Sequence, residues 1–361
     1  MKMKIAIVYG TRPELIKLIP LILLMKGDPR IDLVIINTGQ HKEMVDDLEA
    51  LFGVQPHHKL EIMSHNQSLT EINQRITQKI EPVLKSIKPS LVLVQGDTST
   101  VTTVGMYCFY NRIAVGHVEA GLRSHNLDEP FPEEFNRRVI SIFARYNFAP
   151  TQLAADNLRS EGISPSRVFI TGNTIVDMVG IVKEKIPAVS NGSTNILITA
   201  HRRENHGIGI KNICDSVKAV IEAFPDVRFT WPVHPNPNVQ QVVMAELSGI
   251  PNVKLTPPMN YMDLSSALAS THLIWTDSGG IQEESPSYKK PVLILRNVTE
   301  RPEIINSGFG KLVGTDPDAI ISSTKEILTN EKLYKRMISG ANPFGDGHAS
   351  EKIRDIILNG Q

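Results

Sequence analysis

The chain has 361 residues, which is long enough for two domains with large buried cores. Lysine plus arginine and aspartate plus glutamate balance at 38 each, so no strong net field would attract nucleic acid or an anionic membrane. Cys108 and Cys214 lie far apart in no paired motif, so we expect two reduced core residues rather than a disulfide.

The first half of the chain predicts strands alternating with helices. The N-terminus enters a strand directly and has no signal-peptide cleavage pattern, so we expect a cytoplasmic protein. The apolar run at 15–25 contains Lys17 and Pro20 and is only about half a membrane span long, so we predict a buried helix. Short aliphatic runs bounded by Gly or Pro predict strands at 5–8, 33–36, 91–94 and 113–115.

The second half repeats this pattern after the polar stretch PAVSNGST at 187–194. Further strands are predicted at 196–199, 227–230, 273–275 and 292–295. Continuous apolar strands that alternate with helices are typical of parallel sheets covered on both faces. The predicted fold class is therefore α/β, with two doubly wound, Rossmann-like domains joined near residues 174–194.

Polar clusters come directly after six of the predicted strands. Open α/β sheets bind ligands at the carboxyl ends of their strands, so three clusters in each half predict one central cleft between two facing domains. The six clusters are GTRPE (10–14), GDT (96–98), HVE (117–119), HRREN (201–205), PVHP (232–235) and SGG (278–280).

The first of these clusters has a structural explanation for most of its residues. Thr11 and Glu14 fit a capping box, with a proline at the helix start. That explanation leaves Arg12 and Lys17 unassigned. The loop lacks both the G-x-G-x-x-G pattern and the P-loop lysine, so it indicates neither a dinucleotide site nor an ATP site.

Several carboxylates fall near the predicted cleft edge of the first half, namely Asp97, Glu119 and the pair Glu133-Glu134. Each alone is also compatible with a helix cap or a surface charge. Carboxylates that converge can share one proton, so that one acts as an acid while another acts as a base. Such a division suits proton transfer at a sugar ring.

The cluster Ser278-Gly279-Gly280 is either a helix N-cap or a turn whose backbone amides and helix dipole hold a diphosphate. Glu284, one turn later, would then accept hydrogen bonds from ribose hydroxyls. His201 and His234 have no further ligand at metal spacing, so we expect no metal and favour a phosphate-binding or proton-donating role.

Taken together, these motifs resemble the non-hydrolysing UDP-N-acetylglucosamine 2-epimerases along nearly the whole chain, in order and in spacing. The opening GTRPE also separates this group from its hydrolysing relatives. The motifs are GTRPELIK (10–17), TGQH (38–41), GDTST (96–100), GHVEAGLRS (116–124), PEEFNR (132–137), TGNT (171–174), AHRREN (200–205), PVHPNP (232–237), TDSGGIQEESPS (276–287), TERPE (299–303) and NPFGDGHAS (342–350).

The resemblance implies a glycosyltransferase-B architecture, with an N-terminal domain of residues 1–174 plus 347–361 and a C-terminal domain of residues 175–346. It implies a homodimer, no cofactor, and reversible interconversion of UDP-N-acetylglucosamine (UDP-GlcNAc) and UDP-N-acetylmannosamine (UDP-ManNAc) for cell-surface polysaccharide. UDP would leave by anti elimination, giving 2-acetamidoglucal, and would then add back.

The resemblance also implies roles for particular residues. The transition state gains positive charge at C1 of the sugar and needs nearby carboxylates, while the leaving diphosphate needs amides and cations. The implied catalytic residues are Asp97, Glu119, Glu133 and His201, and the implied UDP-sugar-binding residues are Arg12, Lys17, Ser278, Gly279, Gly280 and Glu284.

Many bacterial members of this group need a second UDP-GlcNAc as an activator. Position 66 is Asn where activated members carry an arginine, and position 43 is acidic where some carry Gln, so we expect weak activation. The matching positions are Gln40, Glu43, Asn66, Arg202 and His234, together with Glu133.

Three alternatives are also compatible with these motifs. A glycosyltransferase of the same architecture would bind the nucleotide in the same way without needing three carboxylates in the first domain. An epimerase that acts on another UDP-HexNAc would carry the same motifs. A catalytically silent UDP-sugar sensor would keep Ser278, Gly279 and Glu284 but show no turnover.

Overall fold

The computed structural model describes residues 2–40, 43–64, 67–186 and 194–360. The chain divides into two compact units, one formed by Met1–Met178 with Phe344–Gln361 and the other by Val179–Pro343. Most of the predicted breaker stretch, residues 187–193, lies outside the described residues.

The first unit is built on a parallel sheet of seven strands in the order β3-β2-β1-β4-β5-β6-β7. The order reverses direction between β1 and β4, as in a Rossmann fold, and this point is the topological switch. The strands are β1 (Met3–Tyr9), β2 (Ile31–Asn37), β3 (His58–Lys59), β4 (Leu91–Gln95), β5 (Ala114–Val118), β6 (Tyr146–Ala149) and β7 (Val168–Ile170).

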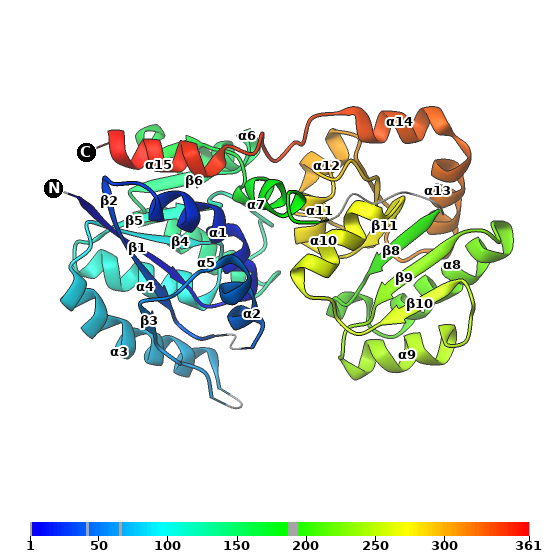
Figure 1. Cartoon of the computed structure of the whole chain (residues 1–361), viewed down its shortest axis with the longest axis horizontal. Helices are drawn as coiled ribbons and strands as arrows, with labels where there is room; N and C mark the ends of the chain where they lie inside the picture. Colours follow the sequence, from blue (N-terminus) through cyan, green and yellow to red (C-terminus); the bar gives the residue numbers. More distant parts are fainter. Residues whose placement is uncertain (1, 41–42, 65–66, 187–193, 361) are drawn as a thin grey trace. The chain divides into compact units, whose positions relative to one another are not determined.

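Helices cover both faces of this sheet. The predicted buried helix at 15–25 is confirmed within α1, whose side chains are buried on nearly all sides because it also packs against the C-terminal helix α15 (Figure 1). The helices of the unit are α1 (Arg12–Lys26), α2 (Glu43–Phe52), α3 (Leu69–Ile87), α4 (Ser99–Tyr110), α5 (Glu133–Phe143), α6 (Gln152–Ser160), α7 (Thr174–Lys183, which runs into the second unit), α15 (Ala349–Asn359) and the 3-10 turn η1 (Pro165–Arg167).

The second unit repeats the design with a parallel sheet of six strands in the order β10-β9-β8-β11-β12-β13. Its switch point lies between β8 and β11. The strands are β8 (Asn195–Thr199), β9 (Arg228–Pro232), β10 (Val253–Thr256), β11 (Leu273–Thr276), β12 (Val292–Ile294) and β13 (Gly310–Leu312). The helices are α8 (Ile208–Ala223), α9 (Pro237–Leu247), α10 (Tyr261–Ser270), α11 (Gly279–Glu284), α12 (Pro302–Asn306), α13 (Pro317–Thr329), α14 (Glu331–Ser339) and the 3-10 turn η2 (Arg203–Asn205).

All eight predicted strands are therefore present, and the predicted fold class of two Rossmann-like α/β domains is confirmed. The core of each unit consists of the aliphatic side chains of its central strands packed against its helices. The strands that the sequence did not predict, β3, β6, β7, β10 and β13, are all short. Two to four residues are too few to display a recognisable apolar pattern.

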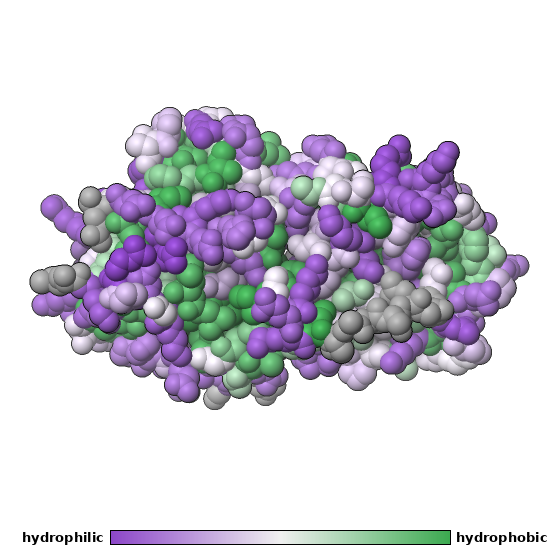
Figure 2. Space-filling model, turned by 45° about the horizontal axis from the view of Figure 1, so that its top comes forward, coloured by the Kyte–Doolittle hydropathy of each residue, from purple (hydrophilic) through white to green (hydrophobic). Residues whose placement is uncertain are grey.

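Cys108 and Cys214 are both buried and unpaired, and burial raises the pKa of each thiol to about 12, as expected for core residues. Among the described residues, no helix is both long and apolar enough to cross a membrane. The face seen in Figure 2 interleaves hydrophilic and hydrophobic side chains, as on an ordinary protein surface.

Candidate active site

Some of the sequence-predicted residues of the first unit lie at its topological switch point, where the loops after β1 and β4 contact each other. A buried carboxylate, that of Glu14, joins these two loops. It accepts the N–H groups of Gly10 and Thr11 at 2.8 and 2.6 Å and the hydroxyl of Thr98 at 2.6 Å. The predicted capping role of Glu14 is confirmed, and the structure adds the link to the β4 loop.

The switch point of the second unit is joined in the same manner by Asp277, which is fully buried. One oxygen of its carboxylate accepts the backbone N–H groups of His201 and Arg202, each at 2.8 Å, and the amide of Asn205 at 3.0 Å. Asp277 therefore fixes the loop after β8 from the end of β11. Asp277 was not among the predicted site residues.

Asp97 follows β4 and is held by two residues of α5. The guanidinium of Arg137 pairs with the Asp97 carboxylate, and the amide of Asn136 donates to the Asp97 backbone carbonyl at 2.9 Å. Arg137 is buried and also lies 3.5 Å from the carboxylate of Glu134. The predicted carboxylate Asp97 therefore lies beside the Arg137 cation.

Glu119 follows β5, the strand next to β4, so Asp97 and Glu119 lie at the ends of neighbouring strands. The Lys17 ammonium pairs with the Glu119 carboxylate, and the amide of Asn173 donates to the same oxygen at 3.1 Å. Lys17 and Glu119, predicted for different roles, are thus brought into direct contact. The backbone φ of Glu119 is +68°, a conformation that non-glycine residues adopt rarely and mostly where surrounding contacts enforce it.

The two adjacent glutamates at the start of α5 have different environments. Glu134 is fully buried and accepts the N–H of Ser124 at 3.0 Å, so it anchors the loop between β5 and α5. Glu133 is half-buried at the first position of the helix. Its catalytic role stays a prediction.

In the second unit, two predicted histidines lie together. The rings of His201 and His234 stack with their centroids 5.2 Å apart, and Nδ1 of His201 is 3.6 Å from the second oxygen of Asp277. Desolvation, reinforced by the neighbouring rings of His201 and His206, lowers the pKa of His234. The described residues contain no group of His, Cys, Asp and Glu side chains arranged to hold a metal ion.

The turn Ser278-Gly279-Gly280 begins the short helix α11. Ser278 occupies the N-cap position of this helix with an extended backbone, but its side chain makes no capping hydrogen bond. A Cβ atom added to Gly279 would lie 2.6 Å from Nη1 of Arg301, so the guanidinium rests directly on this glycine. A larger residue at this position would have to displace the guanidinium. The turn thus combines backbone amides with a cation.

The adjacent carboxylates Glu283 and Glu284 are both buried and have distinct partners. Glu283 accepts Nε–H of Arg301 at 2.5 Å and thereby orients the guanidinium over the glycine turn. Glu284 accepts the hydroxyl of Tyr261 at 3.2 Å, and its carboxylate lies near Gly280. Glu283 therefore orients the Arg301 cation, whereas the carboxylate of Glu284 lies next to the glycine turn.

Glu300 links the arginines around this turn. It pairs with Arg296 at 2.7 Å and lies 3.6 Å from Arg301 and 4.0 Å from Arg202. Burial raises the pKa of the Glu300 carboxyl, but Arg301 and Arg296 outweigh that effect and bring the pKa to about 2. Glu300 is thus ionised at neutral pH and holds three guanidiniums in one region of the unit.

Besides Glu133, three predicted residues of the first unit belong to the predicted activator set. Gln40 follows β2, and its side-chain oxygen accepts the hydroxyl of Thr100 at 3.0 Å, so it lies beside the β4 loop. Glu43 is the first residue of α2, but its side chain lies outside the described residues, as does all of Asn66. Arg12, the first residue of α1, is half-buried at the switch point.

His117 on β5 is fully buried, and its Nε2 lies 2.7 Å from the carbonyl oxygen of Gly96. Burial lowers its pKa to about 4 from an ordinary 6.5, so the folded protein keeps a neutral ring while the unfolded chain binds a proton below pH 6.5. The contribution of His117 to the free energy of unfolding is therefore fully present above pH 6.5 and is lost as the pH falls towards 4. We expect the free energy of unfolding, measured by urea titration with circular dichroism, to lose up to about 3 kcal/mol from this residue.

The matched variant for this prediction is His117→Asn, which removes the titrating ring but keeps an amide donor. It is expected to be less stable at neutral pH and to show a shallower fall in stability between pH 6.5 and 4. An unchanged slope in the variant would show that other groups control the acid instability.

Several residues of this site were not assigned from the sequence although they lie within or beside recognised motifs. Arg137 follows Glu134 at a spacing of three on a helix, which is a signal for an ion pair. Asp277 directly precedes the serine-glycine turn. Asn173 and Arg301 stand in TGNT and TERPE, and only the three-dimensional structure shows their partners.

Two doubly wound units, each with candidate site residues at its switch point, place the chain in the two-Rossmann-domain class of the glycosyltransferase-B fold. The MurG structure from Acinetobacter baumannii, at 12% identity and a TM-score of 0.62 over 99% of this chain and 100% of that chain, shares the fold alone. A family model described as UDP-N-acetylglucosamine 2-epimerase matches residues 24–358. The chain belongs to this UDP-N-acetylglucosamine 2-epimerase family.

Individual relatives agree with this assignment over their full lengths. The UDP-N-acetylglucosamine 2-epimerase of Neisseria meningitidis is 43% identical over 369 residues, covering 99% of both chains. A crystal structure of the UDP-GlcNAc 2-epimerase from that organism bound to UDP-GlcNAc matches with a TM-score of 0.93 at 42% identity, over 99% of this chain and 100% of that chain. The crystal structure of the Methanocaldococcus jannaschii UDP-GlcNAc 2-epimerase in complex with UDP-GlcNAc and UDP matches with a TM-score of 0.85 at 34% identity, over 99% of this chain and 100% of that chain.

Proposed function

We propose that this protein interconverts UDP-GlcNAc and UDP-ManNAc. Family membership and the names of the full-length relatives support the epimerase activity and the UDP-GlcNAc substrate. The observation that carries the proposal further is the pair of carboxylates at the ends of neighbouring strands β4 and β5, each beside its own cation. Simple nucleotide binding does not need this pair, whereas proton transfer at a sugar does.

The reaction requires removal of the hydrogen at C2 of the sugar, which is not adjacent to a carbonyl group within the ring. Loss of the C2 proton therefore has to accompany breakage of the bond between C1 and the diphosphate oxygen, which gives 2-acetamidoglucal and UDP. A second group then protonates C2 from the opposite face while the diphosphate oxygen adds back to C1. We assign these proton transfers jointly to Asp97, Glu119 and Glu133, with positive charge at C1 stabilised by the carboxylates that are ionised.

The second unit has the groups that a nucleoside diphosphate needs. The amides of Ser278-Gly279-Gly280 and the guanidinium of Arg301 would hold the leaving diphosphate, and His201 would donate to it or protonate it. Arg12 and Lys17 would add positive charge from the first unit. Glu283 orients Arg301, and we assign the ribose hydroxyls to the neighbouring carboxylate of Glu284, which lies near Gly280.

Glu284→Ala is expected to weaken UDP binding by about 1.5–3 kcal/mol, the scale of a hydrogen bond to a charged group. Isothermal titration with UDP measures this change. Tyr261→Phe is the matched control, because it removes the hydroxyl that contacts Glu284 but leaves the carboxylate in place, and it should weaken binding less. Unchanged UDP affinity in Glu284→Ala together with a lower melting temperature would assign Glu284 a purely structural role.

The experiment that tests the proposal is incubation of the purified protein with UDP-GlcNAc alone, followed by chromatographic separation of the sugar nucleotides. We expect UDP-ManNAc to appear until a constant ratio is reached, and the same ratio to be reached from UDP-ManNAc. A silent UDP-sugar sensor would bind the nucleotide without forming product. Conversion of a different UDP-HexNAc at a much higher kcat/KM would identify that sugar as the substrate.

A further inference from the structure

Two sequence motifs that the proposed chemistry does not use, TGNT (171–174) and NPFGDGHAS (342–350), contact each other in the first unit. The N–H of Asn173 donates to the carbonyl of Phe344 at 2.7 Å. The backbones of Gly172 and Gly345 approach so closely that a Cβ added to Gly345 would lie 3.2 Å from Cα of Gly172. Both glycines also have positive φ, so neither position readily accepts a larger residue.

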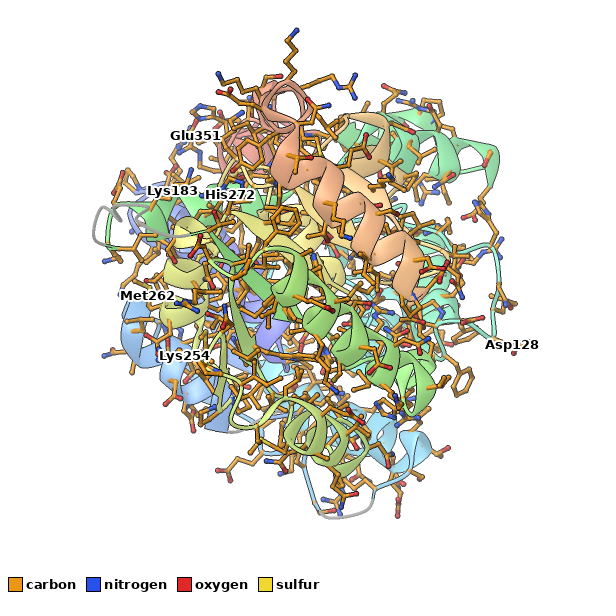
Figure 3. All side chains as sticks on the ribbon, turned by 90° about the vertical axis from the view of Figure 1, so that its right-hand side faces the viewer. Asp128, Lys183, Lys254, Met262, His272 and Glu351 are labelled. Carbon is orange, nitrogen blue, oxygen red and sulfur yellow. The ribbon has the colours of Figure 1, made fainter. Side chains whose placement is uncertain are left out.

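The same segment is fastened a second time at the start of α15. The carboxylate of Asp177 accepts the N–H groups of Ala349 at 3.2 Å and Ser350 at 2.8 Å, and so caps this helix from α7. Glu351, labelled in Figure 3, follows in the first turn and is exposed. We refer to residues 344–350 as the return segment, because the chain re-enters the first unit at Phe344.

Asn173 is buried, and its polar groups form hydrogen bonds with different partners. The side-chain oxygen accepts the N–H of Ile175 at 3.1 Å, and the side-chain amide donates to the Glu119 carboxylate at 3.1 Å. With its backbone N–H bonded to Phe344, the residue has little freedom to rotate. The amide can therefore hold one oxygen of Glu119 in a fixed direction.

Glu119 needs such a constraint because its charge partner alone would not supply one. An ammonium such as that of Lys17 is a flexible point charge that attracts a carboxylate without a preferred orientation. A neutral amide on a rigid backbone adds direction. Proton transfer at C2 depends on direction as well as charge, and a misplacement of about 1 Å can cost about 100-fold in rate.

We propose that Asn173 is a positioning residue for Glu119 and that the return segment holds Asn173 in place. This inference rests on the proposed epimerase function. The chain passes between its two units at residues 178–179 and 343–344. Asn173 and Phe344, whose backbones are hydrogen-bonded to each other, lie close in sequence to these two crossing points. The orientation of a proposed catalytic carboxylate is thereby linked to the segments that connect the units.

The test uses Asn173→Asp in the full-length enzyme. This change keeps the oxygen that accepts the Ile175 N–H but replaces the amide donor with a second carboxylate oxygen facing Glu119. We expect kcat at neutral pH to fall by about 10- to 100-fold, with KM within about threefold and a melting temperature near that of wild type. Because two adjacent carboxyl groups can share a proton at lower pH, the ratio of variant to wild-type kcat should rise between about pH 8 and about pH 5.

A second pair of variants tests the return segment. Gly345→Ala and Gly347→Ala both place a side chain at a positive φ, but only the first meets the backbone of Gly172, since a Cβ at Gly347 has nothing within 4 Å. We expect Gly345→Ala to reduce kcat at least about fivefold more than Gly347→Ala, with UDP affinity retained in both. Equal kcat values in the two folded variants would show that the return segment does not support Glu119.

The outcomes separate this inference from the function on which it depends. If wild type forms no UDP-ManNAc, the proposed function fails before the variants are compared. If wild type is active and Asn173→Asp stays within about twofold of it at every pH, Asn173 does not position Glu119. A reduced kcat whose ratio to wild type is independent of pH would also overturn the proposal, because it would indicate a general structural effect.

Discussion

Asp97→Asn is expected to lower the rate of epimerisation by at least about 100-fold while UDP affinity remains close to that of wild type. Loss of a positioned acid or base typically costs about 10²–10⁴-fold. The substitution preserves the shape of the side chain but removes the charge that pairs with Arg137, so it also removes the ionised group from the end of β4. UDP binding should survive because we assign the diphosphate to residues of the second unit.

The measurement is kcat and KM from UDP-ManNAc formation, together with calorimetric UDP binding. Asp128→Asn is the matched control, because Asp128 lies exposed between β5 and α5, as Figure 3 shows, and should have wild-type activity. Activity of Asp97→Asn within a few-fold of wild type would remove Asp97 from the mechanism. A large fall in the Asp128 control would mean that the assay is sensitive to any charge change in this region.

Asp277→Ala is expected to destabilise the second unit by about 3 kcal/mol or more. The substitution removes a fully buried carboxylate. The three N–H donors that bond to this carboxylate, from His201, Arg202 and Asn205, then lose their acceptor. Because the loop after β8 would lose its attachment to β11, we also expect at least about a tenfold loss of kcat through displacement of His201.

Tryptophan fluorescence during urea unfolding measures this effect directly, because both tryptophans, Trp231 and Trp275, are buried in the second unit. Asp277→Asn is the comparison. Its amide oxygen can still accept from the three donors, so it should be markedly more stable than the alanine variant. Equal stability of the two variants would mean that these hydrogen bonds contribute little to the fold.

The parts of the fold that were predictable share a physical cause. Strands such as β1 and β4 lie in the middle of a parallel sheet, so they need continuous aliphatic sequences that are visible without a structure. Short strands such as β3, with two residues, and β13, with three, are fixed by their neighbours in the sheet and leave no pattern in the sequence. The element order could therefore be predicted, whereas the edges of the sheets could not.

The candidate site shows the same division. The functional side chains could be located because polar residues directly after buried strands stand out against aliphatic sequence. The partners of these side chains could not be predicted, because Glu119 is separated in sequence from Lys17 by 102 residues and from Asn173 by 54. The adjacent residues Glu133 and Glu134 also differ in burial: Glu134 is fully buried and lies 3.5 Å from Arg137, whereas Glu133 is half-buried.

The glycine turn of the second unit illustrates how a partner changes the interpretation. From the sequence alone, Glu283 and Glu284 are two negative charges next to a proposed anion site. In the folded protein Glu283 is bonded to Arg301, which rests on Gly279, so the first carboxylate supports the cation of that site. The arginine is 18 residues away from its glutamate in sequence, and no periodicity connects them.

Incorporation of deuterium at C2 is the measurement that tests the central claim most directly. The protein is incubated with UDP-GlcNAc in deuterium oxide without any acceptor, and the sugar nucleotides are examined by nuclear magnetic resonance. Removal and return of the C2 proton predicts deuterium at C2 of both the UDP-ManNAc formed and the UDP-GlcNAc that remains at equilibrium. UDP-GlcNAc that keeps its C2 hydrogen throughout, with no UDP-ManNAc formed, would contradict the account and favour a transferase or a binding protein of the same fold.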